Sequence, residues 1–162
     1  MDGFADWLKS TTISAAIVHY PWIWPLCETI HFIGLALVIG IAGFFDLRLM
    51  GFMKMVPVRA ARDLMPLAIF GFVLNLTTGV AFLIGHPEQY VNNAAWWAKV
   101  AFLVVAGLNA LLFETILGAR TLNLGAGDDT PPMAKLIGAV SLVSWLGVLY
   151  SGRMLPFIGD AF

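Results

Sequence analysis

Two ionisable side chains near the start of a long apolar segment are the first candidates for chemistry. Glu28 and His31 stand three residues apart, so on a helix they share a face. Trp22 and Trp24 mark a membrane interface, which puts His31 roughly 10 Å deeper at about 1.5 Å per residue. Ionisable groups at that depth face a bundle interior and mark candidate functional sites. His31 is therefore a candidate haem ligand, metal ligand or proton-handling group beside a quinone.

A structural role for the same residues is the alternative. Glu28 could hydrogen-bond His31, or it could pair with Arg153, whose helix ends on the same side of the membrane. In the functional interpretation, Glu28 orients the ring of His31 by accepting a hydrogen bond from it. Arg153 would then be the charge partner of a haem propionate or of Glu28.

Two further histidines, His19 and His86, fall near the same membrane boundary as His31. A bis-histidine haem needs one imidazole on each face of the iron, and His31 and His86 come from neighbouring predicted helices. His86 is the shallower of the two, and a haem standing on edge would bridge part of that difference. We therefore take His31 and His86 as candidate haem-iron ligands.

The remaining polar residues of the apolar segments are expected to be structural. Asn75 and Asn109 lie near the middle of two predicted helices. Amide side chains in lipid form hydrogen bonds worth ~0.6–2 kcal/mol between helices, so we expect these two to hold the second and third helices together. Toward the other boundary lie Asp46, Arg48 and Glu114. There we expect a salt bridge between Glu114 and Arg48.

Helices in a bilayer must position all these groups. Hydrophobic residues make up 60% of the 162 residues, charged residues make up 12%, and the mean hydropathy is +0.86. An average soluble domain is about half apolar and a quarter charged. We predict an all-α fold, a four-transmembrane-helix bundle forming one domain over 1–162, with a short interfacial N-terminal helix. The predicted spans cover residues 25–53, 64–85, 95–118 and 133–149. Small residues such as Gly40 and Gly71 are expected to let helices approach closely.

Aromatic and basic residues indicate the orientation. We call the A side the one holding the N-terminus, the loop between the second and third spans, and the C-terminus; the other two loops form the B side. The interfacial aromatic residues gather on the A side: Trp22, Trp24, Tyr90, Trp96, Trp97 and Tyr150. Six of the nine Lys and Arg residues fall on the B side, which indicates that this side faces the cytoplasm. We therefore expect a multi-pass protein of the bacterial inner membrane with both termini in the periplasm.

Several function classes find no support in the sequence. A net charge of −1 argues against nucleic acid as a partner. The single cysteine, Cys27, excludes an intramolecular disulfide and a multi-cysteine metal cluster. The sequence contains no Walker loop, GxSxG, HExxH or CxxC motif. A non-catalytic redox subunit is therefore a better expectation than a stand-alone enzyme.

Charged residues embedded in apolar helices also support a family resemblance. The runs Glu28-x-x-His31-Phe-Ile-Gly34 and Asp46-Leu-Arg48-Leu-Met-Gly51, followed by Lys99…Asn109 and Gly152-Arg153, resemble a bacterial family of small four-helix membrane proteins without an assigned activity. More loosely, the chain is similar to copper-resistance-D-like and small cytochrome-b-like membrane proteins. That similarity implies redox or metal work on the periplasmic side.

Three functions fit these observations. The first is an electron-transfer subunit of a membrane oxidoreductase, with haem b or a quinone bound near the A side. The second is a structural or assembly subunit without a cofactor. The third is the handling of copper or another metal through His31, Cys27 and methionines, whose soft sulfur ligands suit Cu(I). The expected partners are the lipid bilayer and either oxidoreductase subunits or further copies of the chain.

Overall fold

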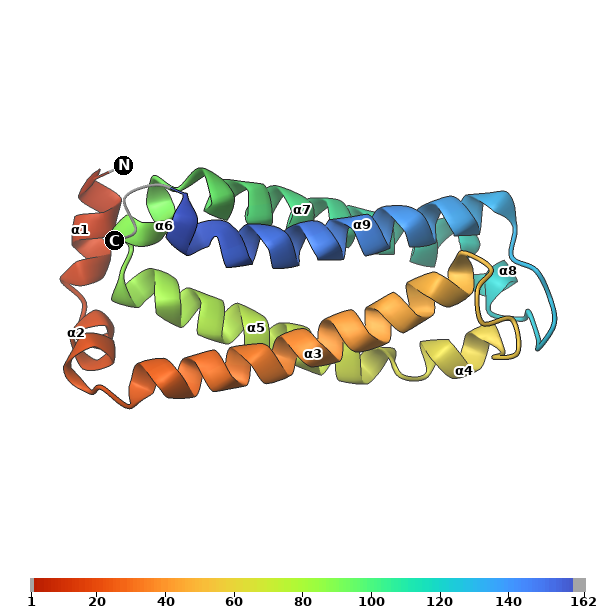
Figure 1. Cartoon of the computed structure of the whole chain (residues 1–162), viewed down its shortest axis with the longest axis horizontal. Coiled ribbons are helices and arrows are strands. Elements are labelled where there is room, and N and C mark those ends of the chain that lie inside the picture. Colours follow the sequence, from red (N-terminus) through yellow and green to blue (C-terminus); the bar gives the residue numbers. More distant parts are fainter. Residues whose placement is uncertain (1, 159–162) are drawn as a thin grey trace.

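The computed structural model describes residues 2–158, and the regular secondary structure of these residues is helical, without strands. Four long helices run side by side (Figure 1). They are α3 (Ile23–Leu49), α5 (Met65–Gly85), α7 (Ala94–Leu112) and α9 (Pro132–Met154). The shorter elements are α1 (Asp2–Lys9), α2 (Thr12–His19), α4 (Val58–Arg62), α6 (Glu88–Val91), η1 (Phe113–Leu117), α8 (Gly118–Thr121) and η2 (Leu155–Phe157).

Four helical stretches are long and apolar enough to cross a membrane, which confirms the predicted fold class. They are Ile23–Leu49, Val58–Gly85, Ala94–Thr121 and Pro132–Phe157. The second stretch joins α4 to α5, and the third joins α7 to α8 through the π-helical turn η1. The chain is therefore a multi-pass membrane protein built from a helical bundle.

Among the helix ends that differ from the predicted bounds, two have a clear cause in the backbone. The first span ends at Leu49 rather than at residue 53, because Gly51 and Met53 have φ values of +92° and +53° and turn the chain into a loop. The last long helix continues to Met154 rather than stopping at 149. Pro156 lies in the short 3-10 turn η2 that follows, since proline cannot donate to the helical hydrogen-bond ladder.

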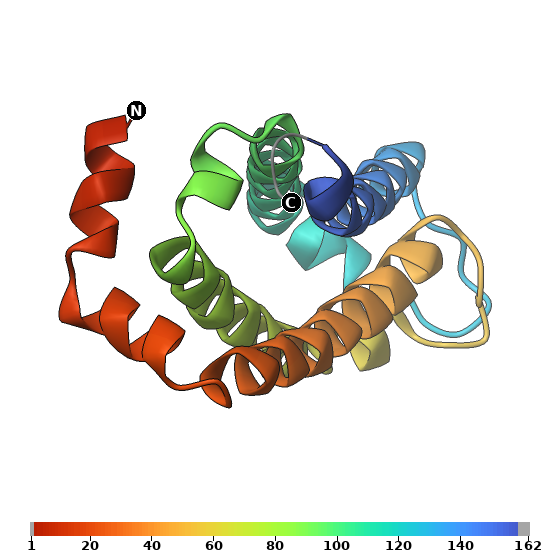
Figure 2. The same ribbon diagram turned by 60° about the vertical axis from the view of Figure 1, so that its left-hand side comes forward.

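The N-terminal segment forms two short helices across the A-side end of the bundle (Figure 1). Both pack on α5, and Figure 2 shows them beside α3 and α5, away from α7 and α9. On α1, Leu8 is buried, whereas Phe4 and Trp7 stack at 6.0 Å and stay exposed. This amphipathic helix fits the predicted interfacial position.

The four long helices do not pack equally. Close packing joins α3 to α5, α7 to α9 and α3 to α9, whereas α5 and α7 do not pack against each other along their lengths. The bundle therefore has one open side, between α5 and α7. Its apolar core is concentrated toward the B side, around Phe45, Leu49, Phe113 and Ile137.

Two glycines set the closest crossing in the bundle. A Cβ atom on Gly34 would lie 2.6 Å from the carbonyl oxygen of Gly71, and one on Gly71 would lie 2.8 Å from the carbonyl oxygen of Gly34. The backbones of α3 and α5 therefore touch where neither residue has a side chain. Gly71 has the packing role expected of it, whereas Gly40 faces open space and has none.

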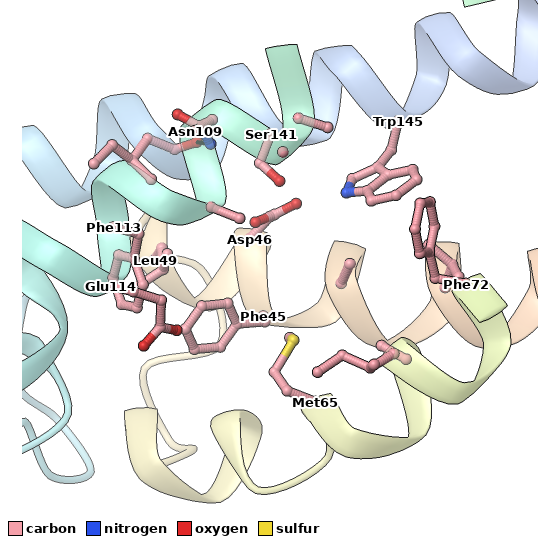
Figure 3. Close-up of a pocket in the computed structure, with 18 of the residues that line it drawn as sticks. Phe45, Asp46, Leu49, Met65, Phe72, Asn109, Phe113, Glu114, Ser141 and Trp145 are labelled. Atoms are coloured by element: carbon pink, nitrogen blue, oxygen red, sulfur yellow. Dashed lines mark hydrogen bonds between the residues drawn. The ribbon is translucent and has the colours of Figure 1, made fainter. Parts of the chain in front are cut away.

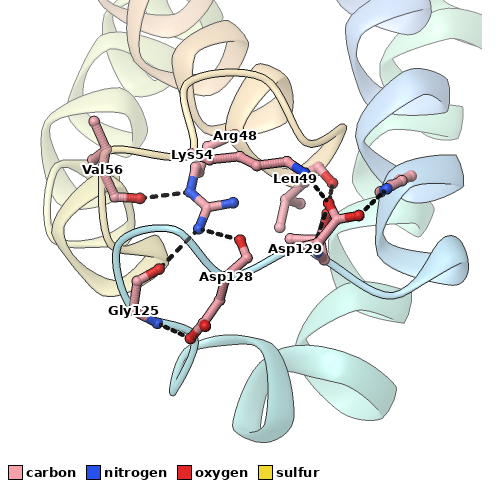
Figure 4. A network of polar contacts seen from close by, with 9 residues as sticks. Arg48, Leu49, Lys54, Val56, Gly125, Asp128 and Asp129 are labelled. Atoms are coloured by element: carbon pink, nitrogen blue, oxygen red, sulfur yellow. Dashed lines mark hydrogen bonds and ion pairs between the residues drawn. The ribbon is translucent and has the colours of Figure 1, made fainter.

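Arg48 ties the two B-side loops to the end of α3 (Figure 4). The side chain is completely buried and donates to the carbonyl oxygens of Val56, Gly125 and Asp128. Beside it, Asp129 forms salt bridges with Lys54 at 3.2 Å and Lys135 at 2.8 Å. The prediction of a salt bridge between Arg48 and Glu114 is therefore wrong, because the guanidinium group of Arg48 donates its hydrogen bonds to loop carbonyl oxygens.

Candidate functional site

His31 lies between α3 and α5 and is held by a hydrogen bond across that interface. Its Nδ1 atom is 2.7 Å from Oγ1 of Thr78, whose single hydroxyl proton goes to the carbonyl oxygen of Leu74, also at 2.7 Å. With that proton used, Thr78 accepts a hydrogen bond when Nδ1 of His31 is protonated. This arrangement corresponds to the tautomer of neutral His31 that carries its proton on Nδ1.

Glu28 does not orient His31 as expected. Its carboxylate accepts a hydrogen bond from Nε1 of Trp24 at 3.1 Å, one turn earlier on the same helix. The expected pair between Glu28 and Arg153 is also absent from residues 2–158. The Arg153 guanidinium lies over the ring of Phe157, with its carbon 5.2 Å from the ring centroid. Glu28, His31 and Arg153 thus form no common site.

His86 and His31 are separated by two aromatic rings. The ring centroids of Trp24 lie 5.1 Å from His86 and 4.8 Å from Phe82, and those of Phe82 and His31 lie 5.5 Å apart. Nδ1 of His86 is 3.4 Å from a carboxylate oxygen of Glu88. The two histidines are thus connected by a series of aromatic contacts through Trp24 and Phe82.

The two central asparagines also differ from the expectation. Nδ2 of Asn75 donates to the carbonyl oxygen of Gly71 on its own helix, at 3.2 Å. Nδ2 of Asn109 donates to the carbonyl oxygen of Ile137 at 3.0 Å and so joins α7 to α9. Neither asparagine connects α5 to α7, the second and third long helices.

A different place in the bundle has the features of a binding site. A cavity of about 280 Å³ lies between α3, α5, α7 and α9, on the side where α5 and α7 separate (Figure 3). Its wall is mainly apolar and aromatic, with Phe45, Phe72, Phe113 and Trp145 among the lining residues. Small-molecule sites combine such walls with a few polar groups and occupy roughly 300–1,000 Å³. At about 280 Å³ the cavity lies at the small end of this range and can hold a single substituted ring.

Asp46 is the central polar group of this cavity. Its side chain is 4% exposed, and Oδ2 has no hydrogen-bond partner within residues 2–158. Figure 3 shows its carboxyl group directed toward Ser141 of α9, with Trp145 farther along the same helix. Unpartnered carboxyl groups in a membrane interior are costly and mark functional sites. Asp46 can accept a proton or, when protonated, donate a hydrogen bond into the cavity.

The spacing of Asp46 and Arg48 in the sequence already indicated that Asp46 has no partner on its own helix, although we expected it to be structural. Asp46 and Arg48 are two residues apart, and residues at that spacing point to different faces of a helix. Arg48 therefore could not neutralise Asp46. Ser141 and Trp145, by contrast, belong to an ordinary apolar helix pattern, and only the packing of α9 on α3 brings them to the site.

An ion pair lies at the edge of the cavity. Arg62 of α4 and Glu114 of η1 both line it, and their side chains meet with 2.6 Å between Nη2 and Oε1. Glu114 therefore does have a basic partner near the B side, although that partner is Arg62 and not Arg48. Nε of Arg62 is buried and has no partner in the described part of the chain.

No protein-family model, curated protein or solved structure matches this chain. The resemblance to small four-helix membrane proteins therefore stays a prediction. No group of three or more His, Cys, Asp or Glu side chains within residues 2–158 is placed to hold a metal ion.

Proposed function

We propose that this protein binds a lipid-soluble quinone in the cavity around Asp46 and serves as a redox subunit of a membrane oxidoreductase. The observation that carries the proposal is a buried carboxyl group inside an aromatic cavity between the apolar helices, with one carboxylate oxygen that has no hydrogen-bond partner within residues 2–158. The site lies toward the B side, whereas the sequence placed the cofactor near the A side with His31.

The open side of the bundle gives a lipid-soluble molecule a way in. Ile69 and Phe72 of α5 line the cavity and are 60% and 37% exposed, and Gly107 and Ala110 line it from α7 and are also exposed. In a bilayer these surfaces face lipid. A ligand dissolved in the hydrocarbon layer can therefore reach the cavity between α5 and α7 without crossing the helices.

The polar groups suit a quinone head group. A quinone has two carbonyl oxygens on a flat six-membered ring, and its reduction requires protons as well as electrons. Protonated Asp46 and the hydroxyl group of Ser141 can donate hydrogen bonds to a carbonyl oxygen, while Phe72, Phe113 and Trp145 supply apolar contacts. The chain itself provides binding and proton exchange, and the electrons come from an associated redox subunit.

Membrane location and partners follow from the same proposal. The excess of basic residues on the B side supports placing that side in the cytoplasm of a bacterial cell, with both described ends of the chain in the periplasm. The cavity would then exchange protons with the cytoplasm. Oxidoreductase subunits would contact the water-exposed loops on one side or the other.

Binding of a short-tailed quinone to the purified protein tests the proposal. We expect Asp46→Ala to weaken decylubiquinone binding about tenfold, since it removes the carboxyl group that donates a hydrogen bond to the ligand. Glu28→Ala is the matched control, because it also removes a carboxyl group from the same helix, outside the cavity. Absence of saturable binding, or equal affinity in the wild type and Asp46→Ala, would contradict the proposal.

A further inference from the structure

Two carboxyl groups line the cavity and differ strongly in their exposure. Of the residues that line it, three carry ionisable side chains: Asp46, Arg62 and Glu114. Asp46 is 4% exposed, whereas the side chain of Glu114 is 47% exposed. One acid thus lies inside the cavity and the other reaches its B-side edge. The two acids therefore line one cavity at different depths.

The backbone places Glu114 at this edge through an irregular turn. Glu114 belongs to the π-helical turn Phe113–Leu117, and π-turns inside longer helices occur often at functional sites. A Cβ atom on Gly118 would lie 3.8 Å from Oε2 of Glu114, so the carboxylate lies over a residue without a side chain. In the third span, the backbone hydrogen bonds therefore change from the α-helical to the π-helical pattern at Glu114.

Arg62 holds Glu114 without fully enclosing it. Nη2 of Arg62 is 2.6 Å from Oε1 of Glu114, and the side chains are 30% and 47% exposed. Ion pairs with this much exposure contribute little net stability, because water competes for both partners. The pair can therefore open and close at the B-side edge of the cavity.

We propose that Glu114, paired with Arg62, is the proton entry to Asp46. This inference rests on the proposed function for its purpose, since protons delivered to Asp46 serve a bound quinone. Glu114 takes a proton from the B-side solution onto a carboxylate oxygen as it leaves Arg62. The proton then passes along water molecules that enter the cavity to the carboxylate of Asp46, and Glu114 returns to its charged form beside Arg62. Only a proton moves in this step.

The neighbouring elements offer no competing acid or base at the cavity. Within residues 2–158, its lining from α5 and α9 is free of titratable side chains, and α3 contributes only Asp46. Arg48 follows Asp46 on α3 but donates to the loop carbonyls of Val56, Gly125 and Asp128. Glu114 is therefore the acid through which Asp46 can exchange.

Hydrogen–deuterium exchange at the Asp46 carboxyl group tests this route without any quinone. The carbonyl stretch of protonated Asp46 is identified by infrared difference against Asp46→Asn, and its shift in D2O gives the exchange rate. We expect Glu114→Gln to slow the exchange about tenfold or more, because a positioned acid no longer carries the proton. Glu28→Gln, which changes a glutamate near the A side, should exchange like the wild type.

Glu114→Asp keeps a carboxyl group and should retain most of the wild-type rate, even if Glu114→Gln folds poorly. Equal rates in the wild type and Glu114→Gln would overturn the proposal, as would the absence of a protonated Asp46 band at every pH. Because no quinone is present, the exchange route can hold even if the quinone proposal fails. Normal exchange with no quinone binding would thus contradict only the proposed function.

Discussion

Asp46 and Arg48 show how two neighbours in one helical turn acquire separate roles. Arg48 is completely buried and holds the B-side loops through three carbonyl oxygens. Asp46 points to another face and meets the cavity, where Ser141 is the nearest hydroxyl drawn in Figure 3. Charge alone would pair the two residues, but helix geometry separates them.

Replacing Ser141 by alanine tests whether this hydroxyl group contacts a ligand. The affinity for decylubiquinone should fall about two- to tenfold, the range expected for one hydrogen bond, with little loss of stability. Ser144→Ala is the matched control on the same helix, since the Ser144 hydroxyl donates to the carbonyl oxygen of Val140 and does not line this cavity. Equal affinities for both variants, measured by titration, would remove Ser141 from the site.

From its contact with Thr78 we expect a structural role for His31, in place of the cofactor-ligand role expected from the sequence, and Thr78 gives the test. Thr78→Val leaves Nδ1 of His31 without an acceptor in a buried interface, which should lower the free energy of unfolding by about 1–3 kcal/mol. Quinone affinity should not change. Thr77→Val, at an exposed residue bonded to the carbonyl oxygen of Val73 on its own helix, should have a smaller effect. Denaturant unfolding in detergent measures both; similar losses would mean that the bond to His31 contributes nothing.

At the scale of helices, α3 and α5 cross in backbone contact at a pair of glycines. The two backbones meet at Gly34 and Gly71, and the B-side loops then fix the end of α3. This arrangement places Asp46 on the side of α3 that meets α9 and the cavity.

Gly34→Ala should therefore destabilise the protein. The new methyl group would lie 2.5 Å from Nδ2 of Asn75 and 2.6 Å from the carbonyl oxygen of Gly71, an overlap expected to cost about 1–3 kcal/mol. Gly40→Ala faces open space on the same helix and should be neutral or stabilising by up to ~1 kcal/mol. Thermal unfolding in detergent compares them, and equal stability of the two variants would refute this packing.

The B-side loops should respond to acid through Asp129. Hydrogen bonds from Lys135 and Lys54, together with their charges, lower the pKa of Asp129 from 3.8 to about 2. A depressed pKa means that the contribution is complete above pH 3.8 and is lost as the pH falls toward about 2. Unfolding between these pH values should show a loss of stability in the wild type that is reduced in Asp129→Asn. Parallel pH profiles would contradict this role.

For the whole molecule, the sequence was sufficient to predict the four spans and the helical bundle, because lipid imposes length and hydropathy on each helix. The cavity could not be predicted, since it depends on α5 and α7 staying apart while α3 packs against both α5 and α9. The pairing of Glu114 with Arg62 escaped prediction for a similar reason. It depends on how the short helix α4 folds back beside η1, which spacing within one helix does not reveal.

Photo-crosslinking with an azido-quinone in the reconstituted protein tests the central claim most directly, because it locates the ligand in the bundle. We predict labelled peptides from residues 65–72 and 103–114, which line the cavity between α5 and α7, and loss of labelling when unlabelled quinone competes. Labelling confined to residues 24–31 and 78–86, where His31 and His86 lie, would contradict the account. Labelling that excess quinone does not displace would contradict it as well.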